Sequence, residues 1–219
     1  LGRAIVRAEG HRLWDEDGRE ILFVSDRGGS AQAWILSADG GEAWCATPFP
    51  LSVSDARWVP SARALSFLIH APADWATGKR TPQEMQKPKN LELDKGVRVI
   101  RQAIYRAEKS YLEELRPHLF ILELESGEIH QLTSGEVSVD DYSWTSDGEQ
   151  VAVRFTHLGD ATNIPLSNLV LFSRDGPAVR TLNEKPGYFS GPLWRPQSAV
   201  PGARHATCTA ASALPTRVR

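Results

Sequence analysis

Residues 14–25 read WDEDGREILFVS, and the same phrase returns at residues 144–155 as WTSDGEQVAVRF. A degenerate copy, WVPSARALSF, occupies residues 58–67, and LWRP at residues 193–196 begins a fourth copy. Self-similarity of this kind means that one supersecondary unit is stacked on copies of itself. The repeat therefore decides the architecture before any single residue is considered.

Each copy carries the signals of two β-hairpins. The Asp-Gly pair after the tryptophan supplies a tight turn, because glycine tolerates positive φ and aspartate hydrogen-bonds to nearby backbone. The short run that follows is rich in β-forming residues, such as ILFV or VAVRF. A second strand–turn–strand phrase comes later, at residues 32–42, 118–128 and 168–176. Two hairpins give four strands, which make one blade of a β-propeller.

The spacing of the tryptophans fits four-stranded blades. Trp58 follows Trp14 by 44 residues, and Trp194 follows Trp144 by 50 residues, whereas one blade takes roughly 40–50 residues. The interval from Trp58 to Trp144 is 86 residues but holds only one strand–turn–strand phrase. We therefore predict an all-β fold: a β-propeller of about three blades plus the start of a fourth, with a long insertion in the second blade at residues 71–117.

The recurring tryptophans also predict the core. We expect all four to pack between neighbouring blades, because aromatic burial is the main stabilisation available there. Trp75 lies outside the repeat register, inside the insertion. Two interpretations of Trp75 stay open: it lines a ligand opening, or it pins the loop to the blade.

The pattern predicts a partial propeller over residues 1–196. Closed propellers have 4–8 blades, and a partial one leaves strand edges unpaired, so we expect the chain to be part of a longer protein. After Pro196 the pattern stops, and residues 197–219 are a mixture rich in Ala, Thr, Pro and Arg. This tail is either an irregular linker or terminal segment, or the product of a shifted reading frame. In both cases we expect it to pack poorly.

Composition excludes several functions. The 219 residues are 41% hydrophobic and 24% charged, as in an ordinary soluble globular protein. The net charge of −2 argues against nucleic-acid binding, and no apolar run is long enough to cross a membrane. Cys45 and Cys208 show neither metal-ligand spacing nor a disulfide framework. The cysteine usage favours a reducing compartment, so we expect a cytoplasmic protein, whose oligomeric state the sequence leaves open.

The sequence contains no catalytic motif. A serine hydrolase of the α/β type needs Gly-x-Ser-x-Gly on a sharp turn, and the nearest string, GYFSG at residues 187–191, has Ser190 one position off. We expect Ser190 to lie in a loop between blades. No His-Glu-x-x-His, phosphate-binding loop or Cys-x-x-Cys occurs, so we expect no catalytic residue, metal or cofactor in this chain. The histidines are scattered, at positions 11, 70, 118, 130, 157 and 205.

The Asp-Gly repeats resemble the propeller of the prolyl oligopeptidase family of serine peptidases. Residues 97–133 narrow the resemblance to the acylaminoacyl peptidase branch, which has a similar tyrosine-bearing excursion followed by Arg-x-His-Leu-Phe and a Gln-Leu-Thr strand end. The matching strings here are VRVI at 97–100, YR at 105–106, SY at 110–111, RPHLF at 116–120 and GEIHQLT at 127–133. The resemblance covers about residues 11–196.

The resemblance implies a function for the parent protein. Members of that family carry an α/β-hydrolase domain after the propeller, and the propeller caps the active site and restricts access to short or unfolded peptides. We therefore expect this chain to be a catalytically silent propeller, with a peptide substrate and the hydrolase domain as its partners. Arg106, Tyr111 and Arg116, in or beside the insertion, are the candidate contacts with peptide or hydrolase.

Two alternatives remain at this point. The Asp-Gly repeat is shared with TolB-like propellers, so the chain could instead be a protein-binding propeller with no enzymatic activity. It could also be a fragment that does not fold stably. A hydrolase signature downstream would favour the peptidase interpretation.

Overall fold

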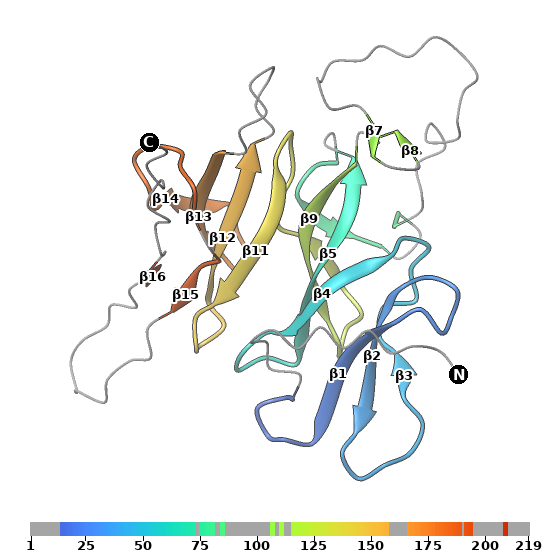
Figure 1. Ribbon diagram of the computed structural model, residues 1–219. Coiled ribbons are helices and arrows are strands. Elements are labelled where there is room, and N and C mark those ends of the chain that lie inside the picture. The colour runs from blue at the N-terminus through green and yellow to red at the C-terminus, as the bar shows by residue number, and fades with distance from the viewer. Residues whose placement is uncertain are drawn as a thin grey trace, which may run out of the picture.

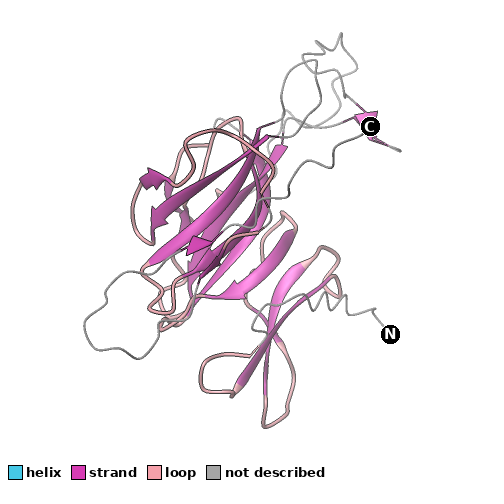
Figure 2. Cartoon of the chain, turned by 60° about the vertical axis from the view of Figure 1, so that its left-hand side comes forward, coloured by secondary structure: helices cyan, strands magenta, loops and turns pink. Residues whose placement is uncertain are grey.

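The computed structural model describes residues 14–72, 75–81, 84–85, 106–107, 110–111, 115–157, 166–189, 191–194 and 208–209. Every regular element in these ranges is a β-strand, and the strands pair in antiparallel sheets (Figure 2). The all-β fold predicted from the repeat is confirmed. Three consecutive sheets stand side by side in chain order (Figure 1).

The first sheet begins within the repeated phrase at residues 14–25. The Asp15 carboxylate accepts hydrogen bonds from the backbone N–H groups of Arg19 (2.7 Å) and Glu20 (2.9 Å), and Gly18 has φ of 68°. This closes the turn between Trp14, which bridges to Ile21, and β1. The strands in order are β1 (Glu20–Ser25), β2 (Gln32–Ser37) and β3 (Trp44–Cys45).

The second sheet is interrupted after its second strand. The β5–β9 ladder runs from Ala64 opposite Glu123 to Pro72 opposite Leu115, so both strands extend into the segment at 71–117. Between them residues 78–80 return to the same sheet, where β6 pairs with β10 as a fifth strand. The strands in sheet order are β4 (Val53–Trp58), β5 (Ala64–Pro72), β9 (Leu115–Glu123), β10 (Ile129–Gln131) and β6 (Gly78–Arg80).

Trp75 precedes β6 and packs against the core between the first two sheets. The Arg80 guanidinium lies 4.3 Å from the centroid of the Trp75 ring, and its Nε donates to Gln131 Oε1 at 2.7 Å. The Gln131 side chain in turn donates to the Trp75 carbonyl at 3.4 Å. These contacts support the second interpretation of Trp75: it fastens the start of the insertion to the outer edge of the sheet.

The third sheet has the four strands of one complete blade. A two-stranded sheet, β15 (Leu193–Trp194) with β16 (Cys208–Thr209), follows it, and β7 (Arg106–Ala107) pairs with β8 (Ser110–Tyr111) within the insertion. Apart from β16, the tail predicted at 197–219 lies outside the described residues. The third sheet consists of β11 (Ser138–Trp144), β12 (Gln150–His157), β13 (Leu166–Ser173) and β14 (Ala178–Thr181).

The hydrophobic core forms two layers, one on each face of the second sheet. Side chains alternate between the faces of a strand, so Leu65 and Phe67 of β5 join the layer against the first sheet, while Ala64 and Leu68 join the layer against the third. The Phe67 and Phe120 rings stack with centroids 6.2 Å apart. Burial on both faces explains why β5 and β9 read as nearly continuous apolar runs.

The tryptophan prediction is confirmed at two positions and wrong at one. Trp58 and Trp144 are each 8% exposed, and the Trp144 indole donates to Ser66 Oγ of the preceding sheet at 2.9 Å. Trp194 is half-buried and donates to the Ser143 carbonyl of its preceding sheet at 2.7 Å. Trp14 is 48% exposed. Trp58, Trp144 and Trp194 each pack against the sheet before them. Among the described residues no sheet precedes Trp14.

Candidate functional site

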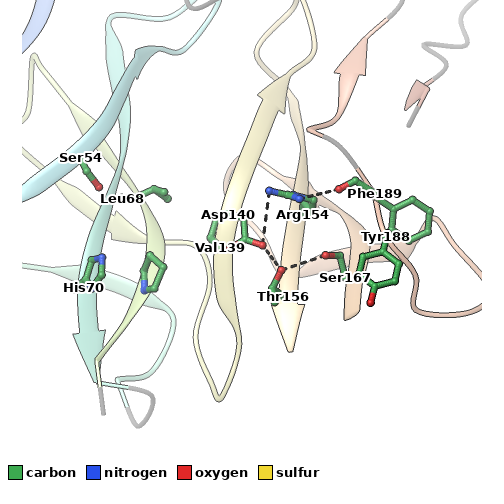
Figure 3. A pocket seen from close by; sticks show the side chains of 11 residues that line it. Ser54, Leu68, His70, Val139, Asp140, Arg154, Thr156, Ser167, Tyr188 and Phe189 are labelled. Atoms are coloured by element: carbon green, nitrogen blue, oxygen red, sulfur yellow. Dashed lines mark hydrogen bonds and ion pairs between the residues drawn. The ribbon is translucent and has the colours of Figure 1, made fainter. Parts of the chain in front are cut away.

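A pocket of about 560 Å³ lies where the second and third sheets meet, at the edge where β4 and β11 begin and β5 and β12 end (Figure 3). Its walls are mixed: apolar side chains come from both sheets, polar ones come chiefly from the third sheet, and two aromatic residues follow β14. The lining residues are Ser54, Leu68, His70, Pro117, Val139, Asp140, Arg154, Thr156, Ser167, Tyr188 and Phe189.

A chain of hydrogen bonds crosses three strands in the wall formed by the third sheet. Thr156 on β12 donates its hydroxyl proton to Asp140 Oδ2 on β11, and its Oγ1 lies 3.1 Å from Ser167 Oγ on β13. The strand register explains this row, because Thr156 pairs with Ser167 directly. Directly opposed residues in antiparallel strands bring their side chains into contact. The Asp140 carboxylate is therefore held in place rather than free to turn.

Arg154 is the cation of the pocket. Its Nη1 donates to the Phe189 carbonyl at 2.7 Å, and its Nη2 lies 3.8 Å from Asp140 Oδ2, which is too long for a hydrogen bond (Figure 3). Its Nε is buried and has no hydrogen-bond partner among the described residues. The side chain is 25% exposed. Arginine carries five N–H donors, so this guanidinium keeps donors that the described protein atoms do not use.

An ionic network beside the pocket ties the two sheets together. Arg57 on β4 contacts Asp55 through both Nε (3.0 Å) and Nη2 (2.7 Å), and Nη2 also reaches Asp141 Oδ1 on β11 at 2.7 Å. Nη1 of Arg57 donates to the Tyr142 carbonyl. Asp55 and Asp141 hold the same place in the repeat, three residues before Trp58 and Trp144. One arginine thus clamps equivalent carboxylates of neighbouring sheets.

Matching bulges place these carboxylates. The β4–β5 register shifts between Ser54 and Arg57, and the β11–β12 register shifts between Val139 and Asp141. A bulge inserts an extra residue and re-aims the side chains around it. In β11 this leaves Asp140 facing the pocket and Asp141 facing Arg57.

Tyr142 completes the contact between the sheets. Its hydroxyl oxygen lies 2.6 Å from the Asp55 carbonyl oxygen and 3.1 Å from that of Ser66, so its one proton is donated between the two. The Arg57 guanidinium lies 4.0 Å from the ring centroid. Burial raises the pKa of Tyr142, although the nearby Arg57 charge opposes the shift. The phenol therefore stays protonated and remains a donor. The wall between the two sheets is rigid for these reasons.

His118 lies on β9, next to Pro117 of the pocket wall, and its own side chain is fully buried. Burial, together with the charges of Arg116 and His70, lowers the pKa of His118 to about 4, and a hydrogen bond with the Gly135 backbone opposes the shift. Its Nδ1 lies 3.4 Å from Thr133 Oγ1, and its Nε2 has no hydrogen-bond partner among the described residues. His118 is thus a neutral core side chain at neutral pH.

The structure does not bring Arg116 into this pocket. Its side chain is mostly buried, and its Nη2 lies 3.6 Å from Glu136 Oε2. Pro117, the next residue, lines the pocket, and alternation along β9 turns Arg116 to the other face of the strand. Arg106 and Tyr111 oppose each other in the β7–β8 pair, but their side chains are outside the described residues. A contact of these three residues with peptide or hydrolase stays a prediction.

The described residues test only some of the other predictions. Ser190 lies outside them. Within them, no three His, Cys, Asp or Glu side chains are grouped as ligands of a metal ion would be. No helix in the same ranges has the length and hydrophobicity that a membrane crossing requires.

Sequence reasoning missed the pocket residues Asp140 and Arg154. A usable signal was present in β12, where Arg154 and Thr156 alternate with Val153 and Phe155. Polar residues on one face of a strand whose other face is core point to a solvated or ligand-facing side. Asp140 lies beside Arg154 and Thr156 because of the bulge in β11, and no local sequence pattern predicts that bulge.

No protein-family model matches the chain. Over 152 residues, 68% of the chain, it is 28% identical to uncharacterized peptidase YuxL of Bacillus subtilis (strain 168), of which it spans 22%. A solved acylaminoacyl peptidase, in complex with Z-Gly-Gly-Phe-chloromethyl ketone, superposes with a TM-score of 0.50 at 13% identity, over 80% of this chain and 25% of that one.

An oligogalacturonate lyase from Vibrio parahaemolyticus gives a TM-score of 0.54 at 13% identity, over 86% of this chain and 42% of that one. At such identities these two structures speak for the fold alone, and the chain spans about a fifth of the length of the curated relative. Together with the repeat, the peptidase relative and the solved neighbours support one statement: the chain has a β-propeller fold and resembles the propeller of prolyl oligopeptidase-like peptidases.

Proposed function

We propose that this chain is the propeller part of a serine peptidase of the prolyl oligopeptidase type, similar to acylaminoacyl peptidase. In this proposal it restricts the access of peptides to an α/β-hydrolase domain that another part of the parent protein supplies. The observation that carries the proposal is the 28% identity to a protein named as a peptidase over 152 residues. The acylaminoacyl peptidase neighbour agrees with it at the level of fold.

The geometry supports a gating role in two ways. The inter-sheet clamp of Arg57, Asp55 and Asp141 makes the second and third sheets one rigid unit, and a gate must not deform when a substrate presses on it. The pocket at the edge of the same two sheets has both apolar and charged groups. A peptide also carries apolar and charged groups, so the pocket can contact both. The proposal places the protein in the cytoplasm, where the free Cys45 stays reduced.

The first test is the coding sequence beyond the codon for Pro196, read in all three frames. The proposal expects further Asp-Gly blades followed by Gly-x-Ser-x-Gly with a later Asp and His. If the frames hold only more blades, or none, the peptidase assignment is overturned and the protein-binding propeller replaces it.

The second test compares the parent protein with its hydrolase domain alone. We expect the parent to hydrolyse short chromogenic peptides and to spare a folded protein substrate, and the isolated hydrolase to lose that discrimination. The 219-residue chain by itself should hydrolyse neither. Equal discrimination with and without the propeller would remove the gating role.

A further inference from the structure

We propose that the pocket between the second and third sheets binds a carboxylate that carries an apolar or aromatic group, with Arg154 as the residue that binds the anion. This deepens the proposed function and rests on it for its biological meaning, since the C-terminal end of a peptide is such a group. A free aromatic carboxylic acid has the same chemistry, and the experiment below separates the two sources.

The Arg154 guanidinium has N–H donors that could bind an anion. Only the Phe189 carbonyl, at 2.7 Å from Nη1, is within hydrogen-bond distance of its guanidinium among the described residues. Asp140 Oδ2 is the nearest carboxylate oxygen in the part of the chain that the structure describes; it is 3.8 Å away and already accepts a hydrogen bond from the Thr156 hydroxyl. A guanidinium presents its donors in a planar fork that matches the two oxygens of a carboxylate. The site therefore has a cation in place with bonding capacity left over.

The neighbouring Asp140 sets the charge of the ligand. Its carboxylate faces Arg154 from the same wall, so the local charge of the pair is close to neutral. A group with a single negative charge can approach Arg154 at a small repulsive cost, whereas the two charges of a phosphate monoester would meet Asp140 more strongly. The pair thus favours a monoanion over a dianion.

The remaining walls define what is attached to the carboxylate. Leu68, Pro117 and Val139 make the apolar side of the pocket, and the Tyr188 ring beside Phe189 is 53% exposed. An exposed aromatic ring at the rim of a cavity can stack with an aromatic ligand. A phenylalanine at the carboxylate end of a peptide satisfies both halves of the pocket.

The test is calorimetric titration of the 219-residue chain with acetyl-Gly-Gly-Phe as the free acid and as the C-terminal amide. We expect the acid to bind at least 10-fold tighter, because a charge-assisted bidentate pair is lost in the amide. Phenyl phosphate should bind more weakly than phenylacetate. Equal binding of acid and amide, or tighter binding of phenyl phosphate than of phenylacetate, would overturn the proposal.

Variants assign the effect to residues. R154Q should abolish the difference between acid and amide, while R180Q, on the exposed strand β14, should keep it. Tyr188→Ala should weaken both ligands several-fold and leave their ratio unchanged. If R154Q does not fold, R154K retains the charge without the fork and should reduce the ratio by severalfold. A folded Arg154 variant that keeps the full ratio would refute the assignment.

The source of the carboxylate follows from a third ligand. If phenylacetate binds as tightly as the tripeptide acid, the site takes small carboxylic acids; if the tripeptide binds much tighter, it takes peptide ends. Either result supports the carboxylate site. The inference fails separately from the proposed function, because the titration does not depend on a hydrolase and the coding-sequence test does not depend on Arg154.

Discussion

Among the ion pairs of the described residues, we expect the largest loss of stability when Arg57 is replaced by methionine. The Arg57 side chain is 10% exposed and bonds to Asp55, Asp141 and the Tyr142 carbonyl. Methionine preserves most of the apolar stem but leaves two carboxylates of neighbouring sheets without their shared cation. Removing one partner of a buried ion pair costs about 3–5 kcal/mol, so we expect a loss of about that size in the free energy of unfolding.

Urea unfolding monitored by tryptophan fluorescence measures this loss, and Arg63→Met is the matched control. Arg63 also pairs with a carboxylate, Glu20 of the first sheet, but its side chain is 44% exposed. Exposed pairs contribute about 0–1 kcal/mol. If R57M costs no more than R63M, the network does not hold the sheets together and the argument for a rigid wall beside the pocket fails. Adding Asp141→Asn to R57M should recover part of the loss, because it removes one of the two negative charges that Arg57 neutralised.

Three further predictions concern single positions. The pKa of His118 is about 4 in the folded chain, against 6.5 ordinarily. Between these two pH values the unfolded chain therefore binds a proton at His118 that the folded chain does not bind. Its contribution to stability is therefore complete above pH 6.5 and falls toward pH 4; between pH 7 and pH 5 the loss should be about 2 kcal/mol, and His118→Gln should remove that loss in urea titrations at the two pH values. Gly148→Ala should lower the free energy of unfolding by about 1 kcal/mol more than Gly18→Ala does. Both glycines have positive φ, which costs alanine about 1–2 kcal/mol. Of the two, only Gly148 also lacks room, because an added Cβ would lie 2.0 Å from the Pro60 carbonyl oxygen. Equal losses at the two glycines would show that the turn of the third sheet yields to its neighbour. Gly191→Ala should destabilise the chain, because the added Cβ would lie 1.7 Å from Asp141 Oδ2. In a double-mutant comparison, an Asp141→Ala background should remove most of that loss of stability. If Gly191→Ala costs as much in that background, the clash with Asp141 is not the cause.

Local sequence was sufficient for the strands and turns of the repeat, but it did not predict β6 in the insertion. The Asp-Gly turns at Gly18 and Gly148 have positive φ, and the short runs after them are rich in β-forming residues, which favours strands. The burial of Trp58 and Trp144 also followed from the repeat. Trp14 departs from its cognates because burial depends on a neighbouring sheet, which the residues around Trp14 do not encode.

The sequence by itself therefore determined the repeating hairpins and the all-β class, because these depend on residues close together in the chain. Only the tertiary structure decided where charges meet. Arg57 and Asp141 are 84 positions apart, and Arg154 reaches Phe189 across 35. The contacts of Asp55, Asp140 and Asp141 depend on the bulges in β4 and β11 and on how one sheet packs on the next. Packing between sheets is a long-range property, and the pocket exists only as its consequence.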